Sequence, residues 1–149
     1  MYTSSPLSRW RAGATDFMNQ FSKRAARRLI QRALVLLKRD KHMRQRLREA
    51  RATTLWVLED WDFAWTVVLH RGRIEFERRP TKQPDVTFSW RTAAEFLNQV
   101  EEGAGPTSSF QIQGKQEQRW VCEPLLTGFL LCLRHVLASP VDDAGESLL

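Results

Sequence analysis

The chain has 149 residues, of which 42% are hydrophobic, so it can form one domain with a substantial core and needs no disulfide staples. The net charge is +6, and the basic excess lies in residues 1–51, which hold 14 Lys or Arg against 3 Asp or Glu. The N-terminus lacks the apolar core of a secretory signal, and no Cys or His spacing resembles a metal site.

The uneven charge indicates an anionic partner, which could be a phospholipid surface, a nucleic acid or an acidic protein. A mitochondrial transit peptide is also Arg-rich, but the basic stretch here continues beyond residue 39 into what reads as folded structure. Cys122 and Cys132 lie in apolar surroundings, which favours two buried thiols over a disulfide.

Residues 1–22 predict an N-terminal tail followed by a short helix. From Arg24 to Arg39 apolar residues recur at spacings of three and four, which predicts an amphipathic helix with one basic face. A second short helix is expected at about 41–51. The basic face of the first helix is formed by Arg24, Arg27, Arg28, Arg32, Lys38 and Arg39.

The pattern then alternates, which predicts strands at 52–60, 63–70, 73–77 and 85–90. Gly72 tolerates positive φ and so indicates a tight turn between the second and third strands.

Two further helices and one strand complete the predicted fold. Thr92 and Glu95 form a T-x-x-E capping box, so a helix begins at Thr92, and Gly103 ends it. A fifth strand covers 109–114. A helix at 124–137 is apolar on every side, with Pro124 near its first turn. This order of elements predicts an α+β domain with one mostly antiparallel sheet covered by helices.

No enzyme signature is present in the chain. His42, His70 and His135 lie in different elements, without a neighbouring nucleophile or carboxylate at a recognisable spacing. Asp60 and Asp62 read more easily as a hairpin turn than as an acid–base pair. We therefore expect a protein without catalytic residues, metal or cofactor.

Three segments carry a family resemblance: "FAWTVVLHRGRIEF" at 63–76, "PDVTFSWRTAAEFLNQV" at 84–100 and "SSFQIQG" at 108–114. With their Gly turn, their "pdv" strand and their "f-x-i-x-G" strand, they resemble the sterol carrier protein type 2 (SCP-2-like) family. The resemblance implies a five-stranded sheet and helices enclosing an apolar tunnel that holds lipid, with no chemistry performed. The helix 124–137 would then roof the tunnel.

The basic helix before the domain and "LWVLEDWDFAW" at 55–65 are most similar to the bacterial accessory proteins of ubiquinone biosynthesis within that family. Those proteins are thought to present polyprenylated intermediates to modifying enzymes. The chain departs from the family in its short loop at 103–108, where members usually carry a longer segment, and this departure bears on the tunnel's volume.

Alternation and the family's general shape together predict the residues that contact lipid and membrane. The expected lipid ligand is an isoprenoid quinone precursor, a sterol-like lipid or an acyl lipid. The predicted lipid-binding residues are Trp56, Trp65, Val67, Leu69, Phe76, Phe88, Phe96, Phe110, Leu125, Phe129 and Leu133. The predicted contacts with an anionic membrane are Arg24, Arg27, Arg28, Arg32, Lys38 and Arg39.

These expectations give a cytoplasmic, peripherally membrane-associated lipid carrier, with enzymes of a lipid or quinone pathway as candidate partners. Its domain would span 23–138, between the N-terminal segment and a C-terminal tail at 139–149. Two alternatives remain open. One is a solid-cored scaffold of a biosynthetic complex, and the other is nucleic-acid binding through the basic helix, with a steep dependence on salt.

Overall fold

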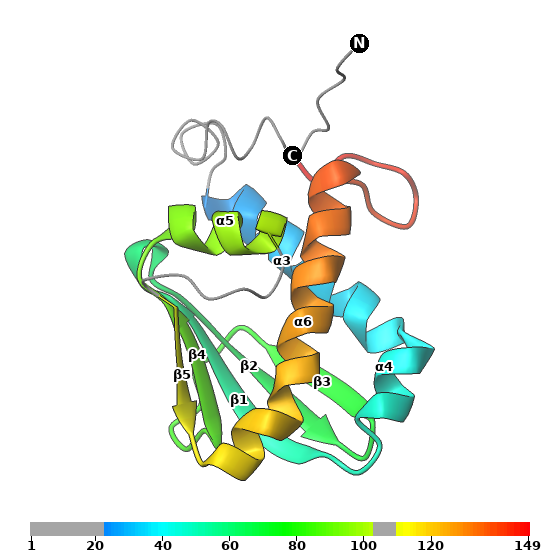
Figure 1. Cartoon of the computed structure of the whole chain (residues 1–149). Coiled ribbons are helices and arrows are strands. Elements are labelled where there is room, and N and C mark those ends of the chain that lie inside the picture. Colours follow the sequence, from blue (N-terminus) through cyan, green and yellow to red (C-terminus); the bar gives the residue numbers. More distant parts are fainter. Residues whose placement is uncertain (1–22, 103–109) are drawn as a thin grey trace.

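The computed structural model describes residues 23–102 and 110–149, which form a five-stranded sheet with helices packed against it (Figure 1). The strands lie in the order β3-β2-β1-β4-β5, and only the β1–β4 pair is parallel. The predicted α+β fold with a mostly antiparallel sheet is therefore confirmed. The strands are β1 (Arg51–Leu58), β2 (Phe63–His70), β3 (Arg73–Glu77), β4 (Val86–Trp90) and β5 (Phe110–Gly114).

The two turns of the β1–β2–β3 meander depend on left-handed backbone. β1 ends in a short 3₁₀ turn, Glu59–Trp61, and Asp62 follows at φ 55°, so the predicted hairpin turn at Asp60 and Asp62 is confirmed. Arg71 and Gly72 join β2 to β3 at φ 52° and 84°. A Cβ on Gly72 would lie 2.6 Å from the carbonyl oxygen of Arg44, so glycine is required there.

The first two described helices differ in how well the sequence predicted them. Helix α3 (Lys23–Arg39) has its apolar stripe buried, as expected. Helix α4 (Lys41–Arg46) ends well before the predicted residue 51, because Leu47 leaves helical geometry and a turn leads directly into β1. Asp40 caps α4 by accepting hydrogen bonds from the backbone N–H groups of His42 and Met43.

Two side chains hold the start of helix α5 (Ala93–Glu102). The Thr92 hydroxyl accepts a hydrogen bond from the Glu95 backbone N–H, as the capping box predicts. Asp60, from the turn after β1, accepts a second one from the Ala93 N–H at 2.9 Å. The predicted end of this helix at Gly103 lies outside the described residues.

Helix α6 (Gln116–Ala138) begins earlier than predicted, so the expectation that Pro124 stands in its first turn is wrong. Proline is tolerated inside this helix because the carbonyl that loses its partner belongs to the exposed Trp120. Within the described residues α6 is the one helix long and apolar enough to cross a membrane, yet half of its most apolar window is buried inside the fold.

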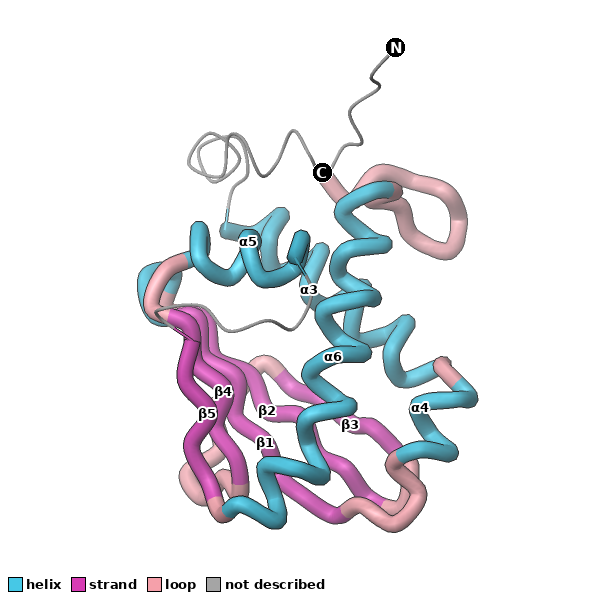
Figure 2. Tube along the Cα trace, viewed as in Figure 1, coloured by secondary structure: helices cyan, strands magenta, loops and turns pink. Residues whose placement is uncertain are grey.

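Helix α6 lies across one face of the sheet, and α3 packs beside α6 on the same face, next to β3 (Figure 2). The inner face of the sheet meets α6 directly: the Trp56 ring lies 4.7 Å from Phe88 and 4.9 Å from Phe129, centroid to centroid. Gly128 lets α3 and α4 approach α6, since a Cβ there would lie 2.5 Å from Cε of Met43. The region between α6 and the sheet is therefore filled by side chains.

The C-terminal residues after α6 fold back instead of trailing away. The Leu148 backbone N–H donates to the Pro140 carbonyl, and the Leu148 side chain is buried. Asp143 then reaches α3, where it forms ion pairs with Arg32 and Arg39 at 2.8 and 3.0 Å.

Candidate lipid pocket

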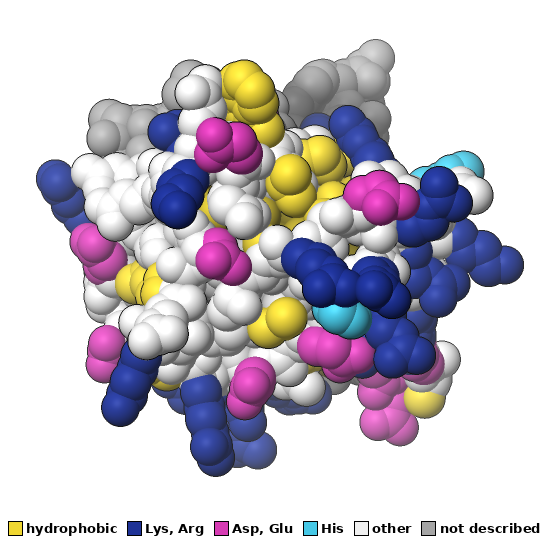
Figure 3. All heavy atoms as spheres, turned by 90° about the horizontal axis from the view of Figure 1, so that it is seen from below, with side chains coloured by type: hydrophobic (Ala, Val, Ile, Leu, Met, Phe, Trp, Pro, Cys, Tyr) yellow, Lys and Arg dark blue, Asp and Glu magenta, His cyan; other side chains and the backbone are white. Residues whose placement is uncertain are grey.

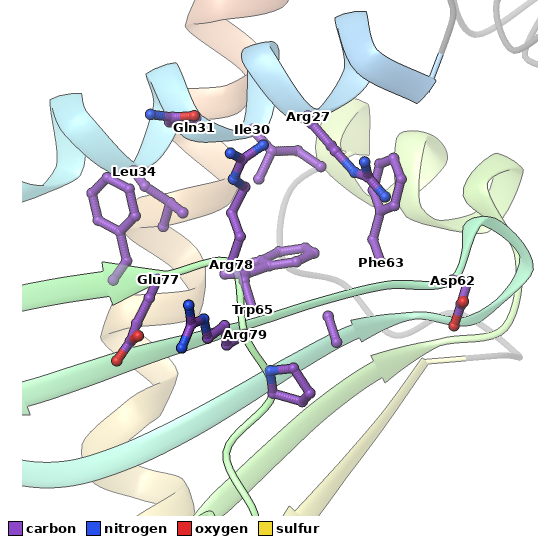
Figure 4. A pocket seen from close by; sticks show the side chains of 13 residues that line it. Arg27, Ile30, Gln31, Leu34, Asp62, Phe63, Trp65, Glu77, Arg78 and Arg79 are labelled. Atoms are coloured by element: carbon purple, nitrogen blue, oxygen red, sulfur yellow. The ribbon is translucent and has the colours of Figure 1, made fainter.

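A pocket of about 770 Å³ lies beside the packed core, between α3 and strands β2 and β3 (Figure 4). This volume is typical of sites for small organic ligands. Its wall is completed by the segment that follows β3. The lining residues are Arg27, Ile30, Gln31, Leu34, Asp62, Phe63, Ala64, Trp65, Phe76, Glu77, Arg78, Arg79 and Pro80.

The deep part of the pocket is apolar. Ile30 and Leu34 come from the buried stripe of α3, where a spacing of four residues puts them on one face. Phe63 and Trp65 point inward from β2, and Phe76 from β3, because alternate residues of a strand share a face. Together they give the deep part of the pocket an apolar surface.

The outer part of the pocket is charged. The Arg27 guanidinium carbon lies 4.5 Å from the centroid of the Phe63 ring, which is a cation–π contact. Arg78 and Arg79 are exposed residues of the wall after β3. Asp62 and Glu77 also line the pocket, but no described residue forms an ion pair with any of the three arginines.

One buried polar atom of a pocket residue has no hydrogen-bond partner among the residues that the structure describes. The indole Nε1 of Trp65 is inaccessible to solvent, and among the described residues nothing accepts its hydrogen bond. The other two tryptophans of the inner sheet face are satisfied, because Trp56 donates to the Thr54 hydroxyl at 2.7 Å and Trp90 donates to Gln99. Trp65 is thus the exception in an otherwise paired set.

Of the predicted lipid-binding residues, Trp65 and Phe76 line this pocket. The Phe110 side chain lies outside the part of the structure that can be described. The other eight are packed in the core, away from the pocket, and their contact with lipid stays a prediction: Trp56, Val67, Leu69, Phe88, Phe96, Leu125, Phe129 and Leu133.

The predicted membrane-contact residues of α3 do not present one free face. Arg32 and Arg39 bind Asp143, and Lys38 pairs with Glu75 of β3 at 3.1 Å. Arg27 lies in the pocket wall. The remaining two, Arg24 and Arg28, are exposed.

The sequence did not predict the polar end of the pocket, and the predicted membrane contacts did not include the basic residues of α4. Arg78 and Arg79 follow β3 directly, and this dibasic pair was the available signal. Helix α4 exposes Lys41, Arg44 and Arg46, and Lys and Arg side chains gather on the side of the molecule where α4 lies (Figure 3).

Comparison with known proteins identifies the family. The model of the SCP-2 sterol transfer family matches residues 33–115, which is more than half of the chain. No curated protein matches it.

Two solved structures are remotely similar. The sec-alkylsulfatase Pisa1 from Pseudomonas sp. is 17% identical with a TM-score of 0.43, over 52% of this chain and 13% of that one. The UbiJ-SCP2 ubiquinone synthesis protein is 9% identical with a TM-score of 0.41, over 72% of this chain and 86% of that one. The family-model match covers every strand of the sheet together with α4 and α5. The chain therefore belongs to the SCP-2 sterol transfer family.

Proposed function

We propose that the protein is a non-enzymatic lipid carrier that holds an apolar chain in the pocket between α3 and strands β2 and β3. The observation that carries the proposal is a pocket of about 770 Å³ with an apolar deep part, within a domain of a lipid-transfer family. Burial of hydrocarbon contributes about 25 cal/mol per Å², so an apolar tail supplies affinity without hydrogen bonds.

We propose further that the carrier docks on the anionic cytoplasmic surface of a membrane. Each basic residue near such a surface contributes about 1 kcal/mol, so a few suffice to recruit a soluble domain. Arg24 and Arg28 of α3 support this proposal, and so do the exposed basic residues of α4. The α4 surface is the stronger candidate, because much of the α3 face is engaged within the molecule.

The proposed pathway is ubiquinone biosynthesis, in which the protein would act as an accessory factor that presents polyprenylated intermediates to enzymes. This assignment is supported by the resemblance of the basic helix and of "LWVLEDWDFAW" at 55–65 to the accessory proteins of that pathway.

One observation favours the alternative of an interaction subunit without a ligand. The layer between α6 and the sheet is packed solid, as the ring contacts of Trp56 with Phe88 and Phe129 indicate. A scaffold would bind a protein partner and leave the pocket beside β2 unused.

Native mass spectrometry of the purified full-length chain, followed by organic extraction, tests the carrier against the scaffold. A carrier is expected to retain about one lipid per chain or to take one up from vesicles. An Ile30→Trp variant, which fills the pocket, should lose that lipid, and Leu36→Trp on the same helix outside the pocket should keep it. A clean protein mass together with no uptake from vesicles would favour the scaffold.

A further inference from the structure

We infer that two copies of the chain associate through the outer face of α6, with the two helices packed antiparallel. The surface is a line of side chains along α6 whose spacing alternates between three and four residues, and we call it the outer stripe. Its members are Glu117, Trp120, Pro124, Thr127, Leu131 and Arg134. This inference goes beyond the carrier function, because it concerns a surface of α6 and not the pocket beside α3.

The outer stripe exposes large apolar side chains. Trp120 is 63% exposed and Leu131 is 55% exposed, and they are the two most exposed large hydrophobic residues that the structure describes. Pro124 lies half-buried between them. Residues at alternating spacings of three and four share one side of a helix, so these side chains form one continuous surface. An exposed tryptophan is a common anchor residue of protein interfaces.

The spacing of the outer stripe fits a helix as the partner. Alternating steps of three and four repeat every seven residues, which is the spacing of the seam between two helices that pack at a shallow angle. From Glu117 to Arg134 the stripe is about 26 Å long at the rise of an α-helix. It therefore provides a long seam for a second helix.

The order of residues along the outer stripe is complementary to its own reverse. In an antiparallel pair related by a twofold axis, residue i of one copy meets residue j of the other, and residue j meets residue i. With the centre of the stripe on the axis, Trp120 of each copy meets Leu131 of the other, and Pro124 meets Thr127. The exposed apolar side chains of each copy would thus be covered by those of the other.

The charges at the two ends of the outer stripe favour the antiparallel direction. Glu117 stands at its N-terminal end and Arg134 at its C-terminal end, and both side chains are exposed. Neither forms an ion pair with a residue in the described part of the chain. Antiparallel packing would bring each Glu117 beside Arg134 of the other copy, whereas parallel packing would bring like charges together.

Helix α4 lies beside the C-terminal half of the outer stripe, and its charge fits the same arrangement. A Cβ on Gly128 would lie 2.5 Å from Cε of Met43, so α4 flanks α6 at this level. Helix α4 is basic, while the acidic residues of α6, Glu117 and Glu123, both lie in its N-terminal half. An antiparallel partner would place that acidic half near α4.

An anionic membrane fits the outer stripe less well than a second copy does. Such a surface attracts Lys and Arg, but the exposed carboxylates of Glu117 and Glu123 stand one turn of α6 before and after Trp120. A membrane would repel these carboxylates, whereas the stripe of a second copy offers Arg134 to the first of them.

Sedimentation equilibrium of the full-length protein, over about a hundredfold range of concentration, measures the dissociation constant of the dimer. The wild type is expected to dimerise within this range. Trp120→Ser removes the largest side chain of the interface from both copies and should leave a monomer over the same range. Val121→Ser is the matched control, because Val121 is an exposed apolar neighbour about 100° around the helix from Trp120. It should leave the dissociation constant unchanged.

Charge reversal tests the direction of packing. Glu117→Arg alone, or Arg134→Glu alone, would place like charges together at both ends of the twofold interface and should raise the dissociation constant about tenfold. The double variant restores opposite charges and should return the dissociation constant to near the wild-type value. Arg119→Glu makes the same charge change on the same helix outside the outer stripe, and it should have little effect.

A wild type that stays monomeric over the whole range would overturn the inference. If Trp120→Ser then also weakened co-sedimentation with anionic vesicles, the outer stripe would be a membrane contact instead. A double variant that associates no better than the single variants would overturn the antiparallel packing. Lipid retention in the pocket is measured separately, so none of these outcomes decides the carrier function.

Discussion

Asp143 of the C-terminal tail holds Arg39 of α3 through two parallel hydrogen bonds, from Nη1 to Oδ1 and from Nη2 to Oδ2, both 3.0 Å long. Arg32, two turns earlier on the same helix, donates to Oδ1 of the same carboxylate at 2.8 Å. One tail carboxylate thus occupies two of the six arginines and lysines that the sequence assigns to an anionic membrane.

The Asp143→Asn substitution is expected to increase binding to anionic vesicles, because it releases Arg32 and Arg39 for lipid head groups. Co-sedimentation with vesicles that contain an anionic phospholipid measures the effect. Glu146→Gln is the matched control, since it removes the same charge from the same tail and no ion pair joins Glu146 to a described residue. Equal gains in the two variants would show that only net charge matters and would contradict a specific release.

The same contact predicts a dependence of stability on pH. Hydrogen bonds from Arg39 and then from Arg32 hold the pKa of Asp143 well below its usual range. The pKa of Asp143 is lower in the folded protein than in the unfolded chain. The stabilisation from its contact with the two arginines is therefore fully present above the ordinary carboxyl pKa, and it is lost as the pH falls through the folded pKa. Urea unfolding of wild type and Asp143→Asn should therefore differ near neutral pH and converge in acid. A constant difference at all pH values would contradict this.

Local patterns were sufficient to predict most of the sheet. Strict alternation of inward and outward residues predicted β2 at Phe63–His70 and β3 at Arg73–Glu77 with their exact bounds. The start of α6 could not be predicted in this way, because residues 116–123 have little apolar periodicity and Pro124 read as a helix start. Residues 116–121 are exposed or half-buried in the fold, so this part of the helix carries no buried apolar stripe that a sequence pattern could have shown.

The site was harder to predict because it depends on where the core leaves space. Inward alternation identified Trp65 and Phe76, but it equally selected residues such as Trp56 and Phe129, which fill the core against each other. Alternation predicts on which face of the sheet a side chain lies. It does not predict how closely the helices pack against that side chain. The pocket and its arginines become apparent only once α3 is positioned over β2 and β3.

The two free cysteines predict slow thiol chemistry in the folded protein. Burial raises the pKa of Cys122 to about 12, with a further effect of Asp85, and raises that of Cys132 to about 11, with a further effect of Asp40. The thiolate is the reactive form, so iodoacetamide should modify the native protein slowly at neutral pH and the urea-unfolded protein quickly. Equal rates in the two states would contradict the burial of these thiols.

The raised thiol pKa values also predict how the stability of the fold changes at alkaline pH. The pKa of each thiol is higher in the folded protein than in the unfolded chain. The contribution of the two thiols to stability is therefore present below the ordinary thiol pKa of 9.0 and is lost as the pH rises toward 11 and 12. Stability measured by urea unfolding should decline over this window, and a Cys132→Ala variant should decline less steeply. An identical decline in wild type and variant would assign the effect to other groups.

Gly128 is where α6 meets the preceding helices, and a larger side chain there should destabilise the fold. A Cβ at this position would lie 2.5 Å from Cε of Met43 and 3.0 Å from Cδ1 of Leu37. Gly128→Val is expected to cost about 1–3 kcal/mol, since overpacking outweighs the gain in helix propensity. Thr127→Val, an exposed neighbour on α6, should change stability little. Urea unfolding compares the two, and equal stability would mean that α3 and α4 shift at no cost.

Gln99 of α5 connects that helix to the sheet through a buried hydrogen bond, which Trp90 Nε1 donates to Gln99 Oε1. Both side chains are fully buried, so Gln99→Leu should leave the indole N–H without this acceptor and cost about 1–3 kcal/mol of folding free energy. Trp90→Phe in the Gln99→Leu background removes that indole donor. A double-mutant cycle measured by urea unfolding should therefore give a favourable interaction free energy between Gln99 and Trp90. Strictly additive effects would mean that another group satisfies the indole, and that α5 is held on the sheet by its apolar contacts alone.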